Sequence, residues 1–570
     1  MNRIIKAHLN SFVESTGISE ATEANQFERF VNYSVIAPRV SAAIDPEDVT
    51  TGEGDDGIDG VTLIIDEEAF FSEDDVETVF KTDKRNHDVE LVFIQAKRSE
   101  SFDLGDFLKF KESILKFVNS SNGHYHVDDP LQRKINAAFN RAITYVPKIR
   151  NGKPSIAIKF VTCGIYQAPI ALESARKDFQ IQLSELGLFF DLDIKFVGRD
   201  ELTSLWVSTY SGTTAKLEMF SNAPLPSIAG IDEAYLAVVK AKDFVENVLT
   251  SSDGNLRAQV FEENVRSFLG LDNIVNGSIS QTINSGESST RFPVLNNGIT
   301  IVSPNVIVQG NILHLENFQI VNGCQTSNVL FENRKTLDDR IMVNLKVVET
   351  SNEDVFSELV RATNSQTKVD EAQFFSLRPI VKKVEQYFNT YEGQESRIYF
   401  ERRDKQYVGR EIPLIRIFPI DVAAKCVVAM FCQRPDLAFR YKKTMYEEFS
   451  ETIFNDNVKE SVYYASCLTL YRLHLLVANN TIPQNSRRYK WHILPLIRVL
   501  LLGNDTAKQL NSKQIEKECD KIIEVMSSHN DQAVELFKKS LEFINSIDNV
   551  TEDRLKRQAI FSEILEKVNE

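Results

Sequence analysis

Two apolar stretches separated by an acidic segment constrain the fold of this chain more than any other feature. Residues 60–65 read Gly-Val-Thr-Leu-Ile-Ile, and residues 89–97 read Val-Glu-Leu-Val-Phe-Ile-Gln-Ala-Lys. Both are rich in the β-branched and aromatic residues that favour strands. The segment between them, 67–88, is acidic. We therefore predict two strands of one sheet, paired as a hairpin across this segment.

Polar residues at the ends of these two strands indicate a chemical site. Asp59 comes directly before the first strand, and Gln95 and Lys97 close the second. Because alternate residues of a strand project to the same face, Gln95 and Lys97 share a face while Ala96 points the other way. The hairpin would bring the Asp59 carboxylate opposite them. Together these groups could hold a divalent metal and activate water.

A predicted amphipathic helix, residues 19–35, supplies a fourth candidate. Its apolar residues recur at helical offsets, and Glu28 lies at the edge of that apolar stripe. Such a position can deliver a carboxylate to the end of a sheet beneath the helix. A solvated surface glutamate is an equally good interpretation of the spacing alone.

The organisation of the whole chain follows from its length and its alternating patterns. A chain of 570 residues is too long for one core. Strand and helix patterns alternate up to about residue 206, and mainly helical patterns follow from about residue 371. We expect an α/β (α+β) protein with a mixed sheet flanked by helices and a mainly helical carboxy-terminal part. The predicted boundaries are a first domain at 1–220, a linker at 221–240, a second domain at 241–520 and a helical segment at 521–570.

Charge and composition limit the partners and the compartment. The net charge of −16 argues against a protein coated in nucleic acid, so any such site must be local. The six cysteines form no C-x-x-C pair, which favours a reducing compartment and no zinc site. The most apolar run, 492–502, contains Pro495 and Arg498 and is too short to span a bilayer. We expect a cytoplasmic protein without a membrane partner, and association of several copies is compatible with the sequence.

Hydrogen-bonding side chains gather at predicted turns in the second half of the chain. Such groups suit recognition of a base, sugar or phosphate, because they donate and accept without the desolvation cost of a charge. Capping turns and tying loops together is an equally good interpretation. The candidate ligand-binding residues are Asn322, Gln325, Asn364 and Gln366.

A basic cluster with interleaved aromatic residues lies between 397 and 410. Arginine and aromatic side chains together suit phosphate contact and base stacking. Acidic residues within the same stretch make an internally salt-bridged surface the alternative. The candidate nucleic-acid-binding residues are Arg397, Arg402, Arg403, Lys405 and Arg410.

The first half of the chain, about residues 15–215, resembles the PD-(D/E)xK nuclease superfamily. The residues Gly57-Ile58-Asp59-Gly60 and Gln95-Ala96-Lys97 carry the match. The resemblance is closer to the Mrr-like restriction endonuclease branch, where glutamine often replaces the acid before the lysine. It implies a restriction-endonuclease-like sheet and a metal-dependent endonuclease. In that reading Asp59 and Gln95 hold Mg²⁺ (or Mn²⁺), Lys97 completes the catalytic set, and Glu28 supplies a second carboxylate.

Five ordered blocks in the second half of the chain carry a further resemblance: 261–270, 296–300, 321–326, 361–367 and 399–407. Through them about residues 240–520 resemble the AIPR family, named for abortive infection and phage resistance. This resemblance implies a bacterial anti-phage defence protein, and we expect an effector that cleaves nucleic acid, with DNA favoured over RNA. The alternatives are a catalytically inactive nuclease fold that binds DNA, a nucleotide or a protein, and an RNA-targeting nuclease.

Overall fold

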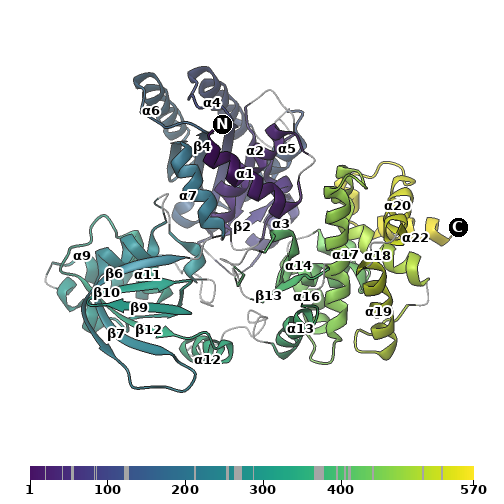
Figure 1. Cartoon of the computed structure of the whole chain (residues 1–570). Helices are drawn as coiled ribbons and strands as arrows, with labels where there is room; N and C mark the ends of the chain where they lie inside the picture. Colours follow the sequence, from purple (N-terminus) through teal and green to yellow (C-terminus); the bar gives the residue numbers. More distant parts are fainter. Residues whose placement is uncertain are drawn as a thin grey trace.

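The described residues of the computed structural model form a five-stranded sheet, a seven-stranded sheet and a helical part that includes the two-stranded sheet β13-β14 (Figure 1). We call residues 1–210 the amino-terminal unit, 214–364 the second-sheet unit and 379–569 the helical unit. The structure describes all of residues 1–570 except 19–20, 41–42, 53–56, 83, 85, 121–126, 211–212, 252–253, 255, 262–272, 287, 365–377, 393–395, 403–405, 408–411, 440–441, 504–505, 528–530 and 570.

The sheet of the amino-terminal unit has five strands in the order β2-β1-β3-β4-β5. The two strands expected from the sequence, β1 and β3, pair antiparallel, with Val61 opposite Phe93. The short β2 and helix α3 occupy the acidic segment between them, and β2 pairs with the other edge of β1. From β3 to β5 the strands run parallel. The bounds are β1 Gly60–Ile65, β2 Glu68–Phe70, α3 Glu73–Phe80, β3 Val89–Lys97, β4 Ser155–Thr162 and β5 Leu192–Val197.

Helices cover both faces of this sheet, which explains the nearly continuous apolar sequence of its strands. Leu91 and Phe93 of β3 pack in the core that contains α4, α5 and α6, whereas Val92 and Ile94 pack in the core that contains α1, α2 and α7. The helix bounds are α1 Arg3–Thr16, α2 Glu23–Ile36, α4 Leu104–Asn119, α5 Pro130–Ile143, α6 Ile170–Glu185 and α7 Arg199–Tyr210.

The second sheet has seven strands in the order β11-β8-β12-β7-β6-β10-β9. The strands are β6 Thr214–Pro224, β7 Glu233–Lys240, β8 Ile299–Ser303, β9 Asn305–Gln309, β10 Ile312–Glu316, β11 Gln319–Asn322 and β12 Met342–Glu349. Helices of this unit include α8 Ala241–Phe244, α9 Ile274–Asn284, α10 Phe292–Leu295, α11 Cys324–Glu332 and α12 Glu353–Asn364.

The predicted linker at 221–240 is replaced by strands of this second sheet. It contains the end of β6 and all of β7, and β7 pairs with β6 on one side and β12 on the other. Within β7, Ala237 and Val239 are buried in one core and Ala234 in another. Pro224 ends a strand and so does not mark a free connection. The chain therefore passes from the first sheet to the second between Tyr210 and Thr214.

The helical unit packs around α17, whose residues are buried on nearly all sides. Ile544 and Phe561 belong to the same core, so 521–570 packs continuously with the preceding helices. This confirms the mixed α/β class with a mainly helical carboxy-terminal part. No described helix is both long and apolar enough to cross a bilayer. The main elements are α13 Pro379–Asn389, β13 Tyr399–Glu401, β14 Ile417–Pro419, α14 Ile420–Met430, α15 Pro435–Ala438, α16 Lys442–Ile453, α17 Glu460–Ala478, α18 Lys490–Leu502, α19 Lys513–Ser527, α20 Asp531–Asn545, α21 Glu552–Leu555 and α22 Gln558–Asn569.

Candidate active site at the end of the first sheet

Asp59 joins the two parts of the predicted site directly. Its backbone N–H donates to the Ile94 carbonyl over 2.9 Å, which continues the pairing of β1 with β3. Its side-chain Oδ2 accepts a hydrogen bond of 2.7 Å from the backbone N–H of Ala96. Ala96 stands between Gln95 and Lys97. The carboxylate is therefore held at the end of β3 by a charge-assisted hydrogen bond.

Gln95 is buried beside the loop that leads to Asp59. Its side chain is only 1% exposed, and its Oε1 atom has no hydrogen-bond partner among the described residues. A Cβ atom at Gly57 would lie 2.8 Å from Gln95 Nε2, and Gly57 has a φ of +78°, so this position requires glycine on both grounds. A buried amide oxygen without a partner costs free energy, which a bound cation or water would offset.

Lys97 is the last residue of β3 and faces α4, on the same side as Gln95. Its Nζ lies 3.5 Å from Asp106 Oδ1, and both side chains are partly exposed, at 33% and 41%. The Lys97 ammonium thus makes one partly exposed ion pair at the end of the sheet. It can reach a negatively charged group in solvent without losing a buried partner.

Glu28 comes from α2 to the same end of the sheet. Partial burial, and after it the carboxylate of Asp59, raise the pKa of Glu28 to about 7, while Arg98, Lys97 and Arg29 act in the opposite direction. A pair of neighbouring acids in which one is shifted towards neutrality is typical of functional sites. Glu28 therefore lies close enough to Asp59 and Lys97 to feel their charges, and Gln95 directly precedes Ala96, whose N–H binds Asp59.

Asn32 belongs to this site, although the sequence did not reveal it. Its side chain is fully buried, and its Nδ2 donates to the Asp59 carbonyl over 2.7 Å and to Thr50 Oγ1 over 3.0 Å. A Cβ atom at Gly60 would lie 2.5 Å from Asn32 Oδ1, so only glycine lets the amide approach so closely. A polar residue next to the apolar stripe of α2, one turn after Glu28, is the signal that could have found it.

The donor set fits a hard divalent cation. Mg²⁺ prefers oxygen ligands and keeps several waters, so one or two carboxylates suffice. Glu28 and Asp59 offer carboxylates, and the partnerless Oε1 of Gln95 offers an amide oxygen. Within the described part of the chain, no group of three or more His, Cys, Asp or Glu side chains is arranged to hold a metal. An ion here would therefore depend on the amide and on water as well as on the two acids.

The predicted ligand-binding residues of the second half are placed differently from one another. Gln325 Oε1 accepts a hydrogen bond of 2.8 Å from Asn276 Nδ2, which ties α11 to α9. Asn322 is exposed at the end of β11. Asn364 ends α12, with a side chain that the structure does not describe, and Gln366 lies outside the described residues. Gln325 therefore has at least a structural role.

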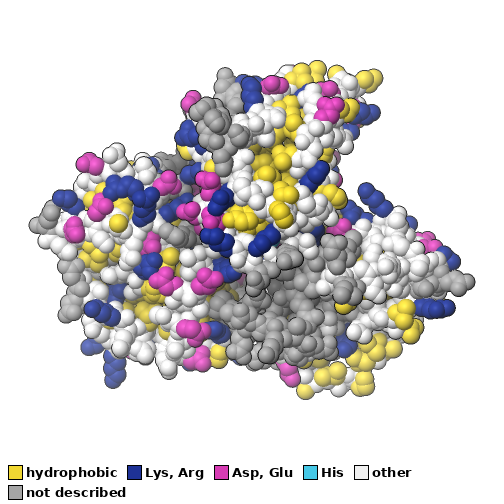
Figure 2. Space-filling model, turned by 180° about the vertical axis from the view of Figure 1, so that it is seen from behind, with side chains coloured by type: hydrophobic (Ala, Val, Ile, Leu, Met, Phe, Trp, Pro, Cys, Tyr) yellow, Lys and Arg dark blue, Asp and Glu magenta, His cyan; other side chains and the backbone are white. Residues whose placement is uncertain are grey.

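Two residues of the predicted basic cluster, Arg397 and Arg402, lie beside acidic side chains. Arg402 is only 5% exposed, and its Nε lies 2.9 Å from Glu385 Oε2 on α13, so its guanidinium faces the interior and not a phosphate in solvent. Arg397 lies 3.3 Å from Glu392 and 4.5 Å from the centre of the Tyr399 ring. Figure 2 shows cationic and anionic side chains intermixed over the described part of one face. Arg403, Lys405 and Arg410 lie outside the described residues.

The fold and the site define a mixed α/β protein that carries a carboxylate, amide and lysine constellation at one sheet end. Comparison with known families adds that residues 261–542, about half of the chain, match the model described as AIPR protein. This segment therefore belongs to the AIPR family. It begins within the second-sheet unit and extends to α20, so the constellation lies outside it. No match was found among curated proteins or among solved structures.

Proposed function

We propose that the amino-terminal unit is a metal-dependent endonuclease of the PD-(D/E)xK type, and that its substrate is DNA. The observation that carries the proposal is the hydrogen bond from Ala96 N–H to the Asp59 carboxylate, which fixes that acid beside Gln95 and Lys97. Glu28 adds a second acid with a raised pKa at the same place. The order of helix, acid, strand and lysine-terminated strand agrees with the resemblance found in the sequence.

Each residue has a distinct role in hydrolysis of a phosphodiester. Asp59 and Glu28 would hold Mg²⁺ or Mn²⁺, with the amide oxygen of Gln95 as a neutral third donor. Such an ion supplies Lewis acidity and lowers the pKa of water. Lys97 presents a cation at the end of the central strand β3, where it can stabilise the charge that develops on the phosphate and orient the attacking water. Asp106 keeps this ammonium at the sheet end until a phosphate replaces it.

The AIPR segment supports a role in abortive-infection defence against phage, with the endonuclease as its output. Loss of DNA or RNA would stop both phage replication and host growth, which is the outcome that abortive infection requires. The two sheets and the helical unit then form one effector whose cleavage takes place in the cytoplasm.

The test uses the purified full-length chain with plasmid DNA and, in parallel, with RNA. We expect cleavage of DNA with Mg²⁺ or Mn²⁺, none with EDTA, and a loss of about 100-fold or more in Asp59→Asn and Lys97→Met. Asp191→Asn and Lys153→Met are matched controls, because both residues are exposed at the opposite end of the sheet. Wild-type rates in the two site variants would reject the proposal. Cleavage of RNA alone would assign the same site to the other substrate.

A further inference from the structure

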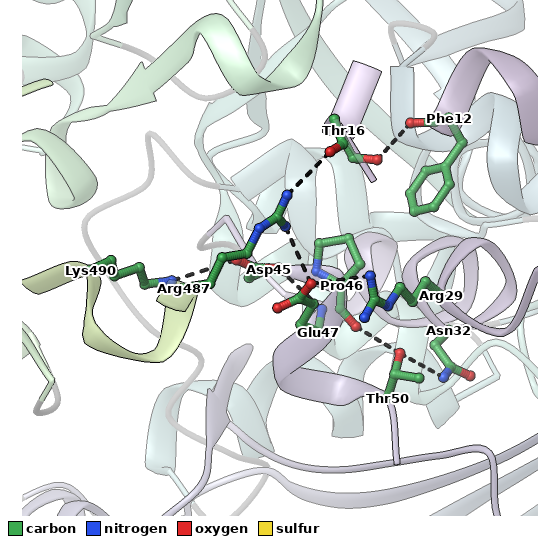
Figure 3. A network of polar contacts seen from close by, with 11 residues as sticks. Phe12, Thr16, Arg29, Asn32, Asp45, Pro46, Glu47, Thr50, Arg487 and Lys490 are labelled. Carbon is green, nitrogen blue, oxygen red and sulfur yellow. Dashed lines mark hydrogen bonds and ion pairs between the residues drawn. The ribbon is translucent and has the colours of Figure 1, made fainter. Parts of the chain in front are cut away.

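We propose that Asn32 is a positioning residue for Asp59, and that the helical unit controls this positioning through a clamp formed by Arg487 and Lys490. The proposal rests on the proposed function of the Asp59 site, and it adds how the AIPR segment reaches that site. The contacts that carry it form a polar network between the amino-terminal unit and the helical unit (Figure 3). Within it Glu47 and Arg487 are 440 positions apart in the chain.

The two cations of the clamp contact the short helical turn η2, Pro46–Val49, and Asp45, the residue directly before it. Arg487 Nη1 lies 3.4 Å from Glu47 Oε1, and Lys490 Nζ lies 3.5 Å from Asp45 Oδ2. Arg487 is only 8% exposed, and its Nη2 also donates to the carbonyl of Gly17, at the end of α1, over 3.3 Å. The helical unit therefore holds the start of η2 and the end of α1 with the same side chain.

The other end of η2 contacts the candidate site. Thr50 Oγ1 donates to the Pro46 carbonyl over 2.7 Å and accepts the hydrogen bond from Asn32 Nδ2. The same Asn32 amide donates to the Asp59 carbonyl, and the backbone N–H of Thr51 donates to that carbonyl over 3.2 Å. A shift of η2 would therefore move the Thr51 donor and disturb the Asn32 donor, which both bind the Asp59 carbonyl.

Glu47 provides a second connection, through α2. Its Oε1 lies 3.1 Å from Arg29 Nη1, and Arg29 follows Glu28 directly in the chain. One carboxylate thus bridges a cation of the helical unit and a cation next to the second acid of the site. Both acids of the constellation, Asp59 and Glu28, are linked to the same turn.

The charges in the clamp favour one defined arrangement. Although burial opposes it, Lys490 and Arg487 hold the pKa of Asp45 below its usual value. Removing one partner of a largely buried ion pair leaves an uncompensated charge, which is strongly unfavourable. The clamp is therefore costly to open. An event that moves the helical unit would open it and misalign Asp59.

Amide hydrogen exchange of the full-length chain tests the coupling without requiring activity. The variants are Arg487→Met, which opens the clamp, and Thr50→Val, which removes only the hydroxyl between η2 and Asn32. Arg488→Met is the matched control, because Arg488 is exposed and lies over the ring of Tyr489, 4.4 Å from its centre. We expect exchange at the amides of Thr51 and Ala96 to rise about 10-fold in Arg487→Met and in Thr50→Val, relative to amides of β4, and not in the control.

Binding of Mn²⁺ and the kinetics of cleavage provide the readouts for positioning. We expect the dissociation constant for Mn²⁺ to rise about 10-fold in Arg487→Met and Thr50→Val, with Arg487→Lys recovering part of the affinity. Asn32→Asp should lower kcat and leave KM for DNA unchanged, because it disturbs an acid and no substrate contact. Should Arg487→Met unfold, Lys490→Met, which removes the ion pair with Asp45 and keeps Arg487, tests the clamp in its place.

The outcomes separate this proposal from the function on which it rests. Wild-type exchange at Thr51 and Ala96 in Arg487→Met and Thr50→Val would overturn the coupling between the helical unit and Asp59, even if the wild-type chain cleaves DNA. A wild-type chain that neither binds Mn²⁺ nor cleaves nucleic acid would overturn the proposed function. The exchange comparison would then still decide whether the helical unit positions Asp59.

Discussion

The carboxylate of Asp59 and the backbone N–H of Ala96, 37 positions apart in the chain, form a hydrogen bond of 2.7 Å at the end of the first sheet. This contact gives Asp59 two roles. The hydrogen bond extends the pairing with β3 beyond the first residue of β1. It also places the Asp59 carboxylate next to Gln95 and Lys97. Substitutions that preserve one role and remove the other can separate stability from chemistry.

Asp59→Asn is expected to keep the fold and lose the chemistry. Its amide oxygen can still accept from Ala96 N–H, so the free energy of unfolding should stay within about 1 kcal/mol of wild type. Without the charge, metal-supported cleavage should fall about 100-fold or more. Denaturation and plasmid cleavage measure the two effects. Asp59→Ala, which loses the acceptor too, should be the less stable variant, and equal stability of the two would contradict the structural role.

Gln95→Glu tests the amide that replaces an acid. The new carboxylate would be buried without a hydrogen-bond partner, so the metal-free protein should lose about 1–3 kcal/mol of stability. Mn²⁺ should restore this loss and bind about 10-fold more tightly than to wild type, because the site gains a negative charge. Thermal unfolding with and without Mn²⁺ measures both. A variant that Mn²⁺ does not stabilise would place the ion elsewhere.

Glu28→Gln should change the pH dependence of stability in metal-free buffer. The pKa of Glu28 is raised from 4.5 to about 7, so its favourable contribution is complete below pH 4.5 and is lost as pH rises through 7. The uncharged variant should match wild type near pH 4.5 and exceed it by about 1–2 kcal/mol at pH 8, a value reduced for partial exposure. Chemical denaturation at both pH values checks this. A difference independent of pH would be inconsistent with a raised pKa.

Arg402→Met should affect folding and leave nucleic-acid affinity unchanged. The substitution removes the cation beside the carboxylate of Glu385, whose side chain is 13% exposed and also accepts a hydrogen bond from Gln406 Nε2, and breaking such a pair costs about 3–5 kcal/mol. The double variant Arg402→Met/Glu385→Gln should recover part of the loss. Denaturation midpoints measure this, and the salt dependence of DNA binding provides the second readout. A slope lowered by about one in Arg402→Met would instead indicate a phosphate contact.

Local patterns predicted the parts of the site that depend on short spacings. The strand period placed Gln95 and Lys97 on one face, and the helical stripe placed Glu28 at an edge near the sheet. Both follow from the geometry of a single element. Asn32 was missed because its importance comes from three partners outside its helix: Thr50, the Asp59 carbonyl and the backbone of Gly60.

The remaining differences come from tertiary contacts that no local pattern contains. Proline and polar residues around 221–226 suggested a linker, but pairing with neighbouring strands made the segment part of a sheet. Arg402 looked available for phosphate because its partner Glu385 lies 17 positions earlier, on helix α13. Arg487 pairs with Glu47, which lies near the other end of the chain, so no local spacing contains this pair.

Because Asn32 approaches Gly60 so closely, the absence of a side chain at position 60 is itself required for the site. A methyl group at position 60 would displace the amide that holds Asp59, and any larger side chain would do so more severely. In a genetic screen for loss of function, position 60 should therefore score like the acid next to it. The Asp-Gly pair, which reads in the sequence as a simple turn signal, encodes the space for a neighbour 28 positions earlier in the chain.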